Sequence, residues 1–333
     1  MKDINIGYIG FGRFAQLRHS ILLKIPNISF IGYFDTNQGL SHQFDLDIFD
    51  SAEDLLASVD AVIISVPPAF AAIFCKQALA KGVHVFCEKP PAIRLADLDG
   101  LEQFSDDLVL GYGFNHRLHD SVMKIKEIID SREMGGILWM RGRYGKEVDS
   151  DYKDNWRCSK KLNGGGILID QGIHLLDIMD WLAGGFDVVQ SILSDSYLNV
   201  KGVEDNAFLN LYCSRNEISA SLHSTITQWR YLFSLEIFLE MGSLTLNGLR
   251  TGSGRYGEEL LTIRPKVDGA YEGEIGDQEF NYLVNNSWER EMIGFASSIR
   301  DAKPYPYSGL SEAKNIMALI ENIYANAVWS HRN

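Results

Sequence analysis

Residues 164–182, GGGILIDQGIHLLDIMDWL, carry two aspartates and a histidine on one side of an apolar helical pattern. In a helix that starts near Asp170, the side chains of Asp170, His174 and Asp177 lie within about 60° of one another, and Trp181 continues that face. A carboxylate and an imidazole on one helix face can exchange protons with a bound molecule or bind a metal ion. We expect no metal, because the segment has no HExxH pattern and no third ligand at matching spacing.

A glycine-rich turn near the N-terminus provides a second chemical pattern. Residues 10–15, GFGRFA, fit G-x-G-x-x-G/A between a predicted strand and a predicted helix. The first glycine permits a tight turn, the second lets the backbone approach a pyrophosphate, and the small sixth residue allows close packing of helix on strand. The N–H groups at the helix N-terminus supply an anion site. The predicted cofactor contacts of this turn are Gly10, Phe11, Gly12, Arg13 and Phe14.

Asp35 ends the second predicted strand, 23 residues after Gly12. An acid at this place can bind both ribose hydroxyls of NAD and would repel the 2′-phosphate of NADP. Two observations weaken this preference for NAD over NADP. Arg13 could reach a phosphate, and Asp35 could simply form the turn before Thr36. We expect NAD(H), with NADP(H) as the less favoured cofactor.

The elements that position these residues change in type along the chain. In the first third, apolar runs such as 4–9, 28–35, 60–66, 83–87 and 108–114 alternate with amphipathic helical patterns. Continuous apolar strands between helices are typical of a parallel sheet that is covered on both faces. We therefore expect a doubly wound Rossmann domain of the α/β class over residues 1–118.

After about residue 120 the predicted strands follow one another with few helices between them. They lie at 137–145, 186–198, 206–213, 217–229, 231–240 and 242–248. Such a succession predicts an α+β domain with a large, open, mostly antiparallel sheet over residues 119–333. The amphipathic helix at 311–329 closes this domain or packs back on the first. One face of the sheet should lack a helical cover and leave an apolar surface such as YLFSLEIF (231–238).

Composition excludes several classes of protein. The net charge of the 333-residue chain is −13, which argues against non-specific binding to nucleic acid or to an acidic membrane. No apolar run approaches 18 residues and no export signal opens the chain, so we expect no membrane association and a cytoplasmic location. The four cysteines form no CxxC pair and are typical of reduced thiols.

Several motifs together resemble one protein family. They are GFGRFA, SVPPAF, GVHVFCEKP, NHRLHD and GGGILIDQGIHLLD, and they extend over nearly the whole chain. In this combination and order the chain resembles the glucose–fructose oxidoreductase, inositol dehydrogenase and rhizopine catabolism (Gfo/Idh/MocA) family. That family consists mostly of NAD(P)-dependent oxidoreductases of sugars, inositols and sugar nucleotides, and its C-terminal sheet often mediates dimers or tetramers.

The resemblance implies roles for individual residues. His174 would be the general base that takes the substrate hydroxyl proton, and an imidazole suits this role because its unperturbed pKa, about 6.5, is close to neutral. Lys89 would stabilise charge on the reacting oxygen, and Asp170 would bind the substrate or the imidazole. Further predicted cofactor contacts are Val66, Pro67, Glu88 and Lys89. Further predicted substrate contacts are Trp156, Arg157 and Tyr144, with Lys146 nearby.

These inferences together predict a dehydrogenase or reductase that acts on CH–OH groups. It would transfer a hydride between NAD(H) and a secondary alcohol or ketone of a sugar, an inositol or a nucleotide-sugar, as a homodimer or homotetramer. Two alternatives remain open at this stage. One is an NAD-assisted glycosidase or lyase of the same family, and the other is a non-catalytic regulator that senses a dinucleotide or a sugar.

Overall fold

The computed structural model describes residues 3–37, 44, 46–104, 107–149, 151–266 and 276–331. The chain forms two compact units. The first unit comprises residues 1–115 and 287–317, and the second comprises residues 116–286 and 318–333. Residues 287–317 belong to the first unit in this division, whereas the sequence pattern placed residues 119–333 in the second domain and left open whether the closing helix packs back on the first.

The first unit is built on a six-stranded parallel sheet with strand order β3-β2-β1-β4-β5-β6. The strands are β1 (Ile4–Ile9), β2 (Ile28–Phe34), β3 (Asp47–Ile48), β4 (Ala61–Ile64), β5 (His84–Cys87) and β6 (Leu110–Tyr112). The helices are α1 (Arg13–Leu22), α2 (Ala52–Leu56), α3 (Pro68–Ala80) and α7 (Ser287–Asp301). The predicted Rossmann architecture is confirmed.

The strands of this sheet are apolar because both faces are covered. Ile6 and Tyr8 of β1 and Phe86 of β5 are fully buried, and Phe295 of α7 packs on Phe86 with ring centroids 5.6 Å apart. Helix α7 therefore completes the core of this unit, although it comes almost 200 residues after β5 in the chain. Cys75 of α3 is also buried in this unit.

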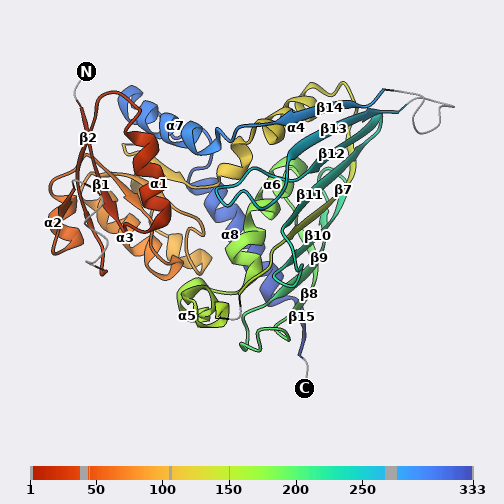
Figure 1. Cartoon of the computed structure of the whole chain (residues 1–333), viewed down its shortest axis with the longest axis horizontal. Coiled ribbons are helices and arrows are strands. Elements are labelled where there is room, and N and C mark those ends of the chain that lie inside the picture. The colour runs from red at the N-terminus through yellow and green to blue at the C-terminus, as the bar shows by residue number, and fades with distance from the viewer. Residues whose placement is uncertain are drawn as a thin grey trace. The chain divides into compact units, whose positions relative to one another are not determined.

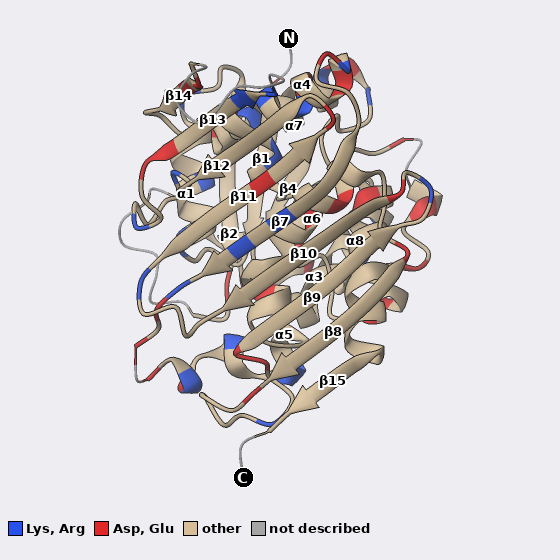
Figure 2. Ribbon diagram, turned by 90° about the vertical axis from the view of Figure 1, so that its right-hand side faces the viewer, with Lys and Arg blue, Asp and Glu red and all other residues tan. Residues whose placement is uncertain are grey.

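The second unit is built on a nine-stranded sheet with order β14-β13-β12-β11-β7-β10-β9-β8-β15 (Figure 2). The strands are β7 (Ile137–Gly145), β8 (Val188–Ser194), β9 (Asn206–Cys213), β10 (Ile218–Thr225), β11 (Leu232–Leu239), β12 (Gly242–Asn247), β13 (Glu259–Pro265), β14 (Gln278–Tyr282) and β15 (Ala327–Ser330). Neighbouring strands are antiparallel except for β10 with β7 and β15 with β8. The predicted open, mostly antiparallel sheet is confirmed.

Helix α6 (Ile173–Ala183) lies against one face of this sheet (Figure 1). The other described α-helices that lie wholly in this unit are α4 (Asp120–Ser131) and α5 (Lys160–Asn163). Helix α8 (Leu310–Ala325) begins in the first unit and ends in the second, and β15 follows it directly. None of the described helices is both long and apolar enough to cross a membrane.

The expected apolar outer surface at YLFSLEIF is wrong in its details. Phe233, Leu235 and Ile237 of this stretch are buried, and it is the alternate side chains, including Glu236 and Phe238, that are partly exposed. Strand alternation shows which residues share a face, but it does not show which of the two faces carries the helices. The exposed apolar side chains of the outer face lie mainly on β8, β9 and β15 instead.

Candidate active site

The glycine turn between β1 and α1 has the geometry of an anion site. Gly10 has φ +79°, and a Cβ there would lie 2.4 Å from the carbonyl oxygen of Ser65, so this position requires glycine. Gly12 caps α1, and a Cβ there would meet no described atom within 4 Å. The open space in front of the helix N-terminus fits a pyrophosphate.

Asp35 follows β2 and is bonded to the glycine turn. Its Oδ2 accepts a hydrogen bond from the Phe11 amide at 2.7 Å, and its Oδ1 accepts one from the Asn37 amide at 2.8 Å. The Phe11 side chain is fully buried, with its ring stacked on Tyr33 at 4.7 Å. Phe11 can therefore contact a ligand only through its main chain, and the Asp35 carboxylate is held at the edge of the turn.

Two other residues of α1 project away from the core. Arg13 is exposed, and the Phe14 ring stacks on Trp288 of α7 with centroids 5.8 Å apart. Phe14 keeps 37% of its surface exposed. Both side chains are thus accessible beside the open end of the helix.

The remaining predicted cofactor residues lie at the same edge of the six-stranded sheet. Val66 and Pro67 follow β4, while Glu88 and Lys89 follow β5 and precede a cis peptide bond to Pro90. The carboxyl ends of parallel strands are where ligands bind in open α/β sheets. Lys89 and the glycine turn are therefore on one edge of the sheet of this unit.

Glu88 belongs to a buried ion network. Its Oε1 accepts a hydrogen bond from Arg18 Nε at 2.6 Å, and Arg18 Nη1 donates to Glu291 at 2.9 Å. Burial raises the pKa of Glu291 to about 8, although the positive charge of Arg18 opposes this rise. The Arg18 guanidinium also lies 4.2 Å from the centroid of the Phe86 ring. Arg18 of α1 thus links α7 to the turn that carries Glu88 and Lys89.

In the second unit, the polar helix begins earlier and less regularly than expected. Residues Leu168–Gly172 form a π-helical turn, and α6 continues from Ile173. Asp170 therefore lies in the π-helical turn and His174 in the α-helix, so a uniform 100° per residue does not describe their relation. Such turns recur at functional sites.

Glu204 fixes the start of this helical segment. Its carboxylate accepts hydrogen bonds from the Gly166 amide at 2.8 Å, the Leu168 amide at 2.9 Å and the Tyr324 hydroxyl at 2.9 Å. A Cβ at Gly166 would lie 2.0 Å from the Glu204 carbonyl oxygen, which explains the glycine. Burial raises the pKa of Glu204 to about 7, against the effect of these hydrogen bonds.

Asp170 is surrounded by donors from two other segments. Its Oδ2 lies 3.2 Å from Lys146 Nζ and accepts a hydrogen bond from the Tyr152 hydroxyl at 3.3 Å, and its Oδ1 lies 3.3 Å from Arg157 Nε. The Arg157 guanidinium lies 4.4 Å from the centroid of the Trp156 ring. Two cations thus share one carboxylate, which leaves local positive charge beside Asp170.

His174 stacks face to face on His116, with ring centroids 3.8 Å apart and planes 13° apart. Both side chains are buried. His116 Nε2 is hydrogen-bonded to the Tyr144 hydroxyl at 2.9 Å. Burial, and next the negative charge of Asp170, raises the pKa of Tyr144, which is therefore a neutral phenol.

Asp177 makes a different contact from that of its neighbours. Its two carboxylate oxygens accept hydrogen bonds from Arg117 Nε and Nη2, both at 2.7 Å, and the Asp177 side chain is almost fully buried. This bidentate pair attaches α6 to the segment that carries His116. Arg117 and Asp177 therefore connect two parts of the second unit.

The second unit thus groups Asp170 with Lys146 and Arg157. It groups His174 with His116, which in turn contacts Tyr144. Sequence reasoning did not single out His116, Tyr152 or Glu204. His116 was within the NHRLHD motif and Glu204 begins EDNAF, but only the folded chain brings them to residues 166–174. The arrangement provides a buried imidazole for proton transfer, a carboxylate with two cations for binding a polar ligand, and a separate anion site in the first unit.

Comparison with known proteins finds family matches for both halves of the chain. Residues 4–107 match the model of an oxidoreductase family with an NAD-binding Rossmann fold, and residues 122–245 match the GFO/IDH/MocA C-terminal domain. A glucose-6-phosphate 3-dehydrogenase of Bacillus subtilis is 31% identical over 214 residues, which is 61% of this chain and 61% of that protein.

Two further relatives cover more of the chain. A myo-inositol 2-dehydrogenase of Thermotoga maritima is 24% identical over 329 residues, 92% of this chain and 91% of that protein. The fold matches that of a levoglucosan dehydrogenase in complex with NADH, with a TM-score of 0.84, 19% identity, and coverage of 98% and 97% of the two chains. Both halves of the chain match models of one family, and the chain belongs to the Gfo/Idh/MocA oxidoreductases.

Proposed function

We propose that the protein is an NAD(H)-dependent oxidoreductase. It transfers a hydride between the nicotinamide and a secondary alcohol or ketone of a sugar, an inositol or a nucleotide-sugar. The observation that carries the proposal is that Lys89 lies on the same sheet edge as the glycine turn and Asp35. Family membership and relatives named as sugar and inositol dehydrogenases support it.

The residues of the chain have distinct proposed roles. When bound, the nicotinamide accepts or supplies the hydride. His174 takes the proton of the substrate hydroxyl during oxidation and returns it during reduction. Lys89 donates a hydrogen bond to the reacting oxygen and stabilises the negative charge that develops there. Asp170 accepts a hydrogen bond from a substrate hydroxyl, while its contacts with Lys146 and Arg157 hold its carboxylate in place.

Cofactor choice follows from Asp35 in this proposal. The carboxylate is fixed by the Phe11 and Asn37 amides, so it stays near the position of the adenosine ribose. A fixed negative charge there favours two ribose hydroxyls over a 2′-phosphate. We therefore propose NAD(H), with Arg13 as the residue that would aid NADP(H).

A substrate panel tests the proposal directly. Inositols, hexoses, sugar phosphates and sugar nucleotides are incubated with NAD, and NADH is followed by its absorbance. NADH formation with at least one polyol or sugar is the expected result. Product formation without NADH would favour a glycosidase or lyase, and NAD binding without any turnover would favour a sensor.

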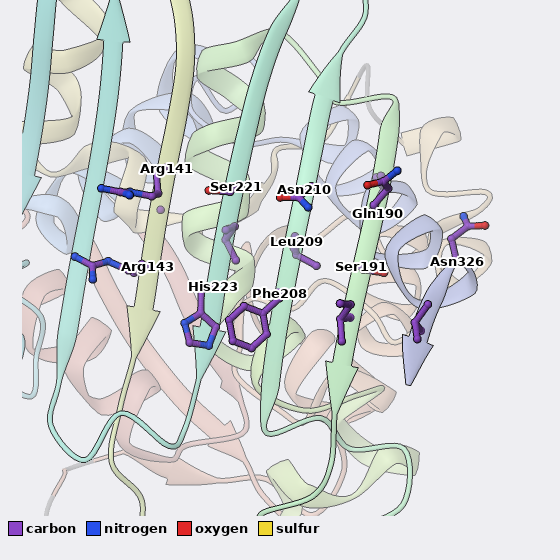
Figure 3. A pocket seen from close by; sticks show the side chains of 15 residues that line it. Arg141, Arg143, Gln190, Ser191, Phe208, Leu209, Asn210, Ser221, His223 and Asn326 are labelled. Carbon is purple, nitrogen blue, oxygen red and sulfur yellow. The ribbon is translucent and has the colours of Figure 1, made fainter. Parts of the chain in front are cut away.

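We also propose a homodimer or homotetramer that forms through the outer face of the nine-stranded sheet (Figures 2 and 3). Val328, Ile192 and Phe208 are 66%, 53% and 51% exposed there and line a shallow depression of about 680 Å³. Nine strands of about seven residues give a face of roughly 1,000 Å². A stable interface needs about 800 Å² from each partner, so a second copy of this chain fits the face.

A further inference from the structure

We propose that His116 is a positioning residue for His174. The His116 imidazole holds the plane of the His174 ring by stacking, and the stacked pair carries no more than one proton at a time. This inference rests on the proposed function of His174 as the general base. It adds a residue to which neither the motif pattern nor the comparisons assign a role. His116, His174 and the residues that surround them lie in the second unit.

Contacts on two sides of His116 hold the stacked rings in place. Arg117, the neighbour of His116, is held by the bidentate contact with Asp177, which lies three residues after His174 on α6. The outer edge of the His116 ring is held by the Tyr144 hydroxyl of β7. Both rings are therefore held at defined positions, and the ring separation of 3.8 Å leaves no room for a solvent layer between them.

A close pair of imidazoles titrates as a unit. When one ring is protonated, a second proton would place two positive charges about 4 Å apart in a buried site, which is strongly unfavourable. The pair then loses its protons in two macroscopic steps that belong to both rings. His174 can take up a substrate proton only while His116 is neutral.

The acidic side chains described near the pair, Glu259, Asp170 and Asp177, each contact another cationic or imidazole group. The His119 ring lies 5.5 Å from His116, and its Nδ1 is hydrogen-bonded to Glu259 at 2.9 Å. Burial would raise the pKa of Glu259, but hydrogen bonds from His119, Ser121 and the Arg250 amide hold it below its usual value. The negative charge of Glu259 is thus directed at His119.

Charges near the other ring are also paired. Asp170, four residues before His174, contacts Lys146 and Arg157, and Asp177 contacts Arg117. Tyr144 is a neutral phenol and can accept from a protonated His116 or donate to a neutral one. A second proton on the pair is therefore opposed by the first, and both rings must be neutral before His174 accepts a substrate proton.

Histidine titration by NMR tests the inference without any substrate. The imidazole carbons of the whole protein are labelled and their shifts are followed against pH, with the exposed His331 as an internal reference. His116 and His174 should both show two-step curves, with the steps more than one pH unit apart. In H116F the His174 curve should become a single step, while H331F should leave both curves unchanged. A single-step His174 curve in the unmodified protein would overturn the coupling.

Kinetics with an identified substrate tests the positioning role. H116A removes the stack and should lower kcat by up to about 10²-fold with little change in KM, because a misplaced base loses alignment. H116F keeps a flat ring over His174 and should restore most of kcat. Equal loss in H116A and H116F would overturn positioning by stacking. If the two histidines titrate as a coupled pair but the protein shows no turnover, the coupling is supported and the proposed function is contradicted. Failure of the coupling and failure of the proposed function are therefore distinguishable.

Discussion

Glu204 provides a prediction whose magnitude follows from the structure. The carboxyl group is buried beneath the start of the helical segment, and its pKa is raised to about 7 in the folded chain. In the unfolded chain the pKa of a glutamate is about 4.3 to 4.5. The folded state therefore binds one more proton than the unfolded state between these pH values.

The sign of the effect follows from this difference. The contribution of Glu204 to the free energy of unfolding is fully present below about pH 4.5 and is lost as pH rises toward and through 7. A shift of this size corresponds to about 3 kcal/mol in total, of which about 2 kcal/mol falls between pH 5.5 and 8. Glu204→Gln removes the ionisation and should flatten this part of the pH dependence.

Urea unfolding of the unmodified protein and of Glu204→Gln is compared at pH 5.5, 6.5, 7.5 and 8. The difference between their unfolding free energies should change by about 2 kcal/mol over this range, with the variant gaining relative stability at high pH. Glu279→Gln, on the exposed strand β14 of the same unit, is the matched control and should follow the unmodified protein. Parallel curves for the unmodified protein and Glu204→Gln would refute the reasoning.

Three further predictions concern function. Asp35→Ala should narrow the preference for NAD(H) over NADP(H) in fluorescence titrations by the equivalent of about 1.5–3 kcal/mol, and equal affinity for both cofactors in the unmodified protein would contradict the role of Asp35. His174→Asn should lower turnover by about 10²–10⁴ while sparing NAD binding, and Lys89→Met should cost at least as much. In the oxidative direction kcat/KM should rise with pH through one ionisation, which we assign to His174. This rise should vanish in His174→Asn, and an unchanged pH profile in the variant would show that another residue is the base. Light scattering at micromolar concentration should give a dimer or tetramer, and Phe208→Arg, on the outer sheet face, should lower the mass without changing the fold.

Much of the fold was predictable because its signals are local. Each strand of the first unit is a short apolar run followed by a helical pattern, and the order of such runs determines a doubly wound sheet. In the second unit the succession of strands predicted an open, mostly antiparallel sheet. The parallel pairing of β10 with β7 was not predictable, because residues about 80 positions apart meet in it and no local pattern specifies that register.

The candidate site was predictable only in part for the same reason. Gly10, Gly12, Asp35 and Lys89 lie in motifs with a known spacing to their strands, so their common sheet edge follows from topology. The contact between His116 and His174 joins segments 58 residues apart, and a histidine pair of that kind leaves no periodicity in the sequence. The placement of Asp170 in a π-helical turn was missed because an ideal α-helical period was assumed.

The π-helical turn also has a consequence for how this protein could diverge. A turn with one residue more than an α-helical turn can lose that residue and become regular helix. Such a deletion within Leu168–Gly172 would rotate every side chain before it by about 100° about the helix axis relative to α6. His174 would stay on His116, while Asp170 or its replacement would face other partners. The ligand-binding role proposed for Asp170 and the proton-transfer role proposed for His174 are thus separable along this one helix.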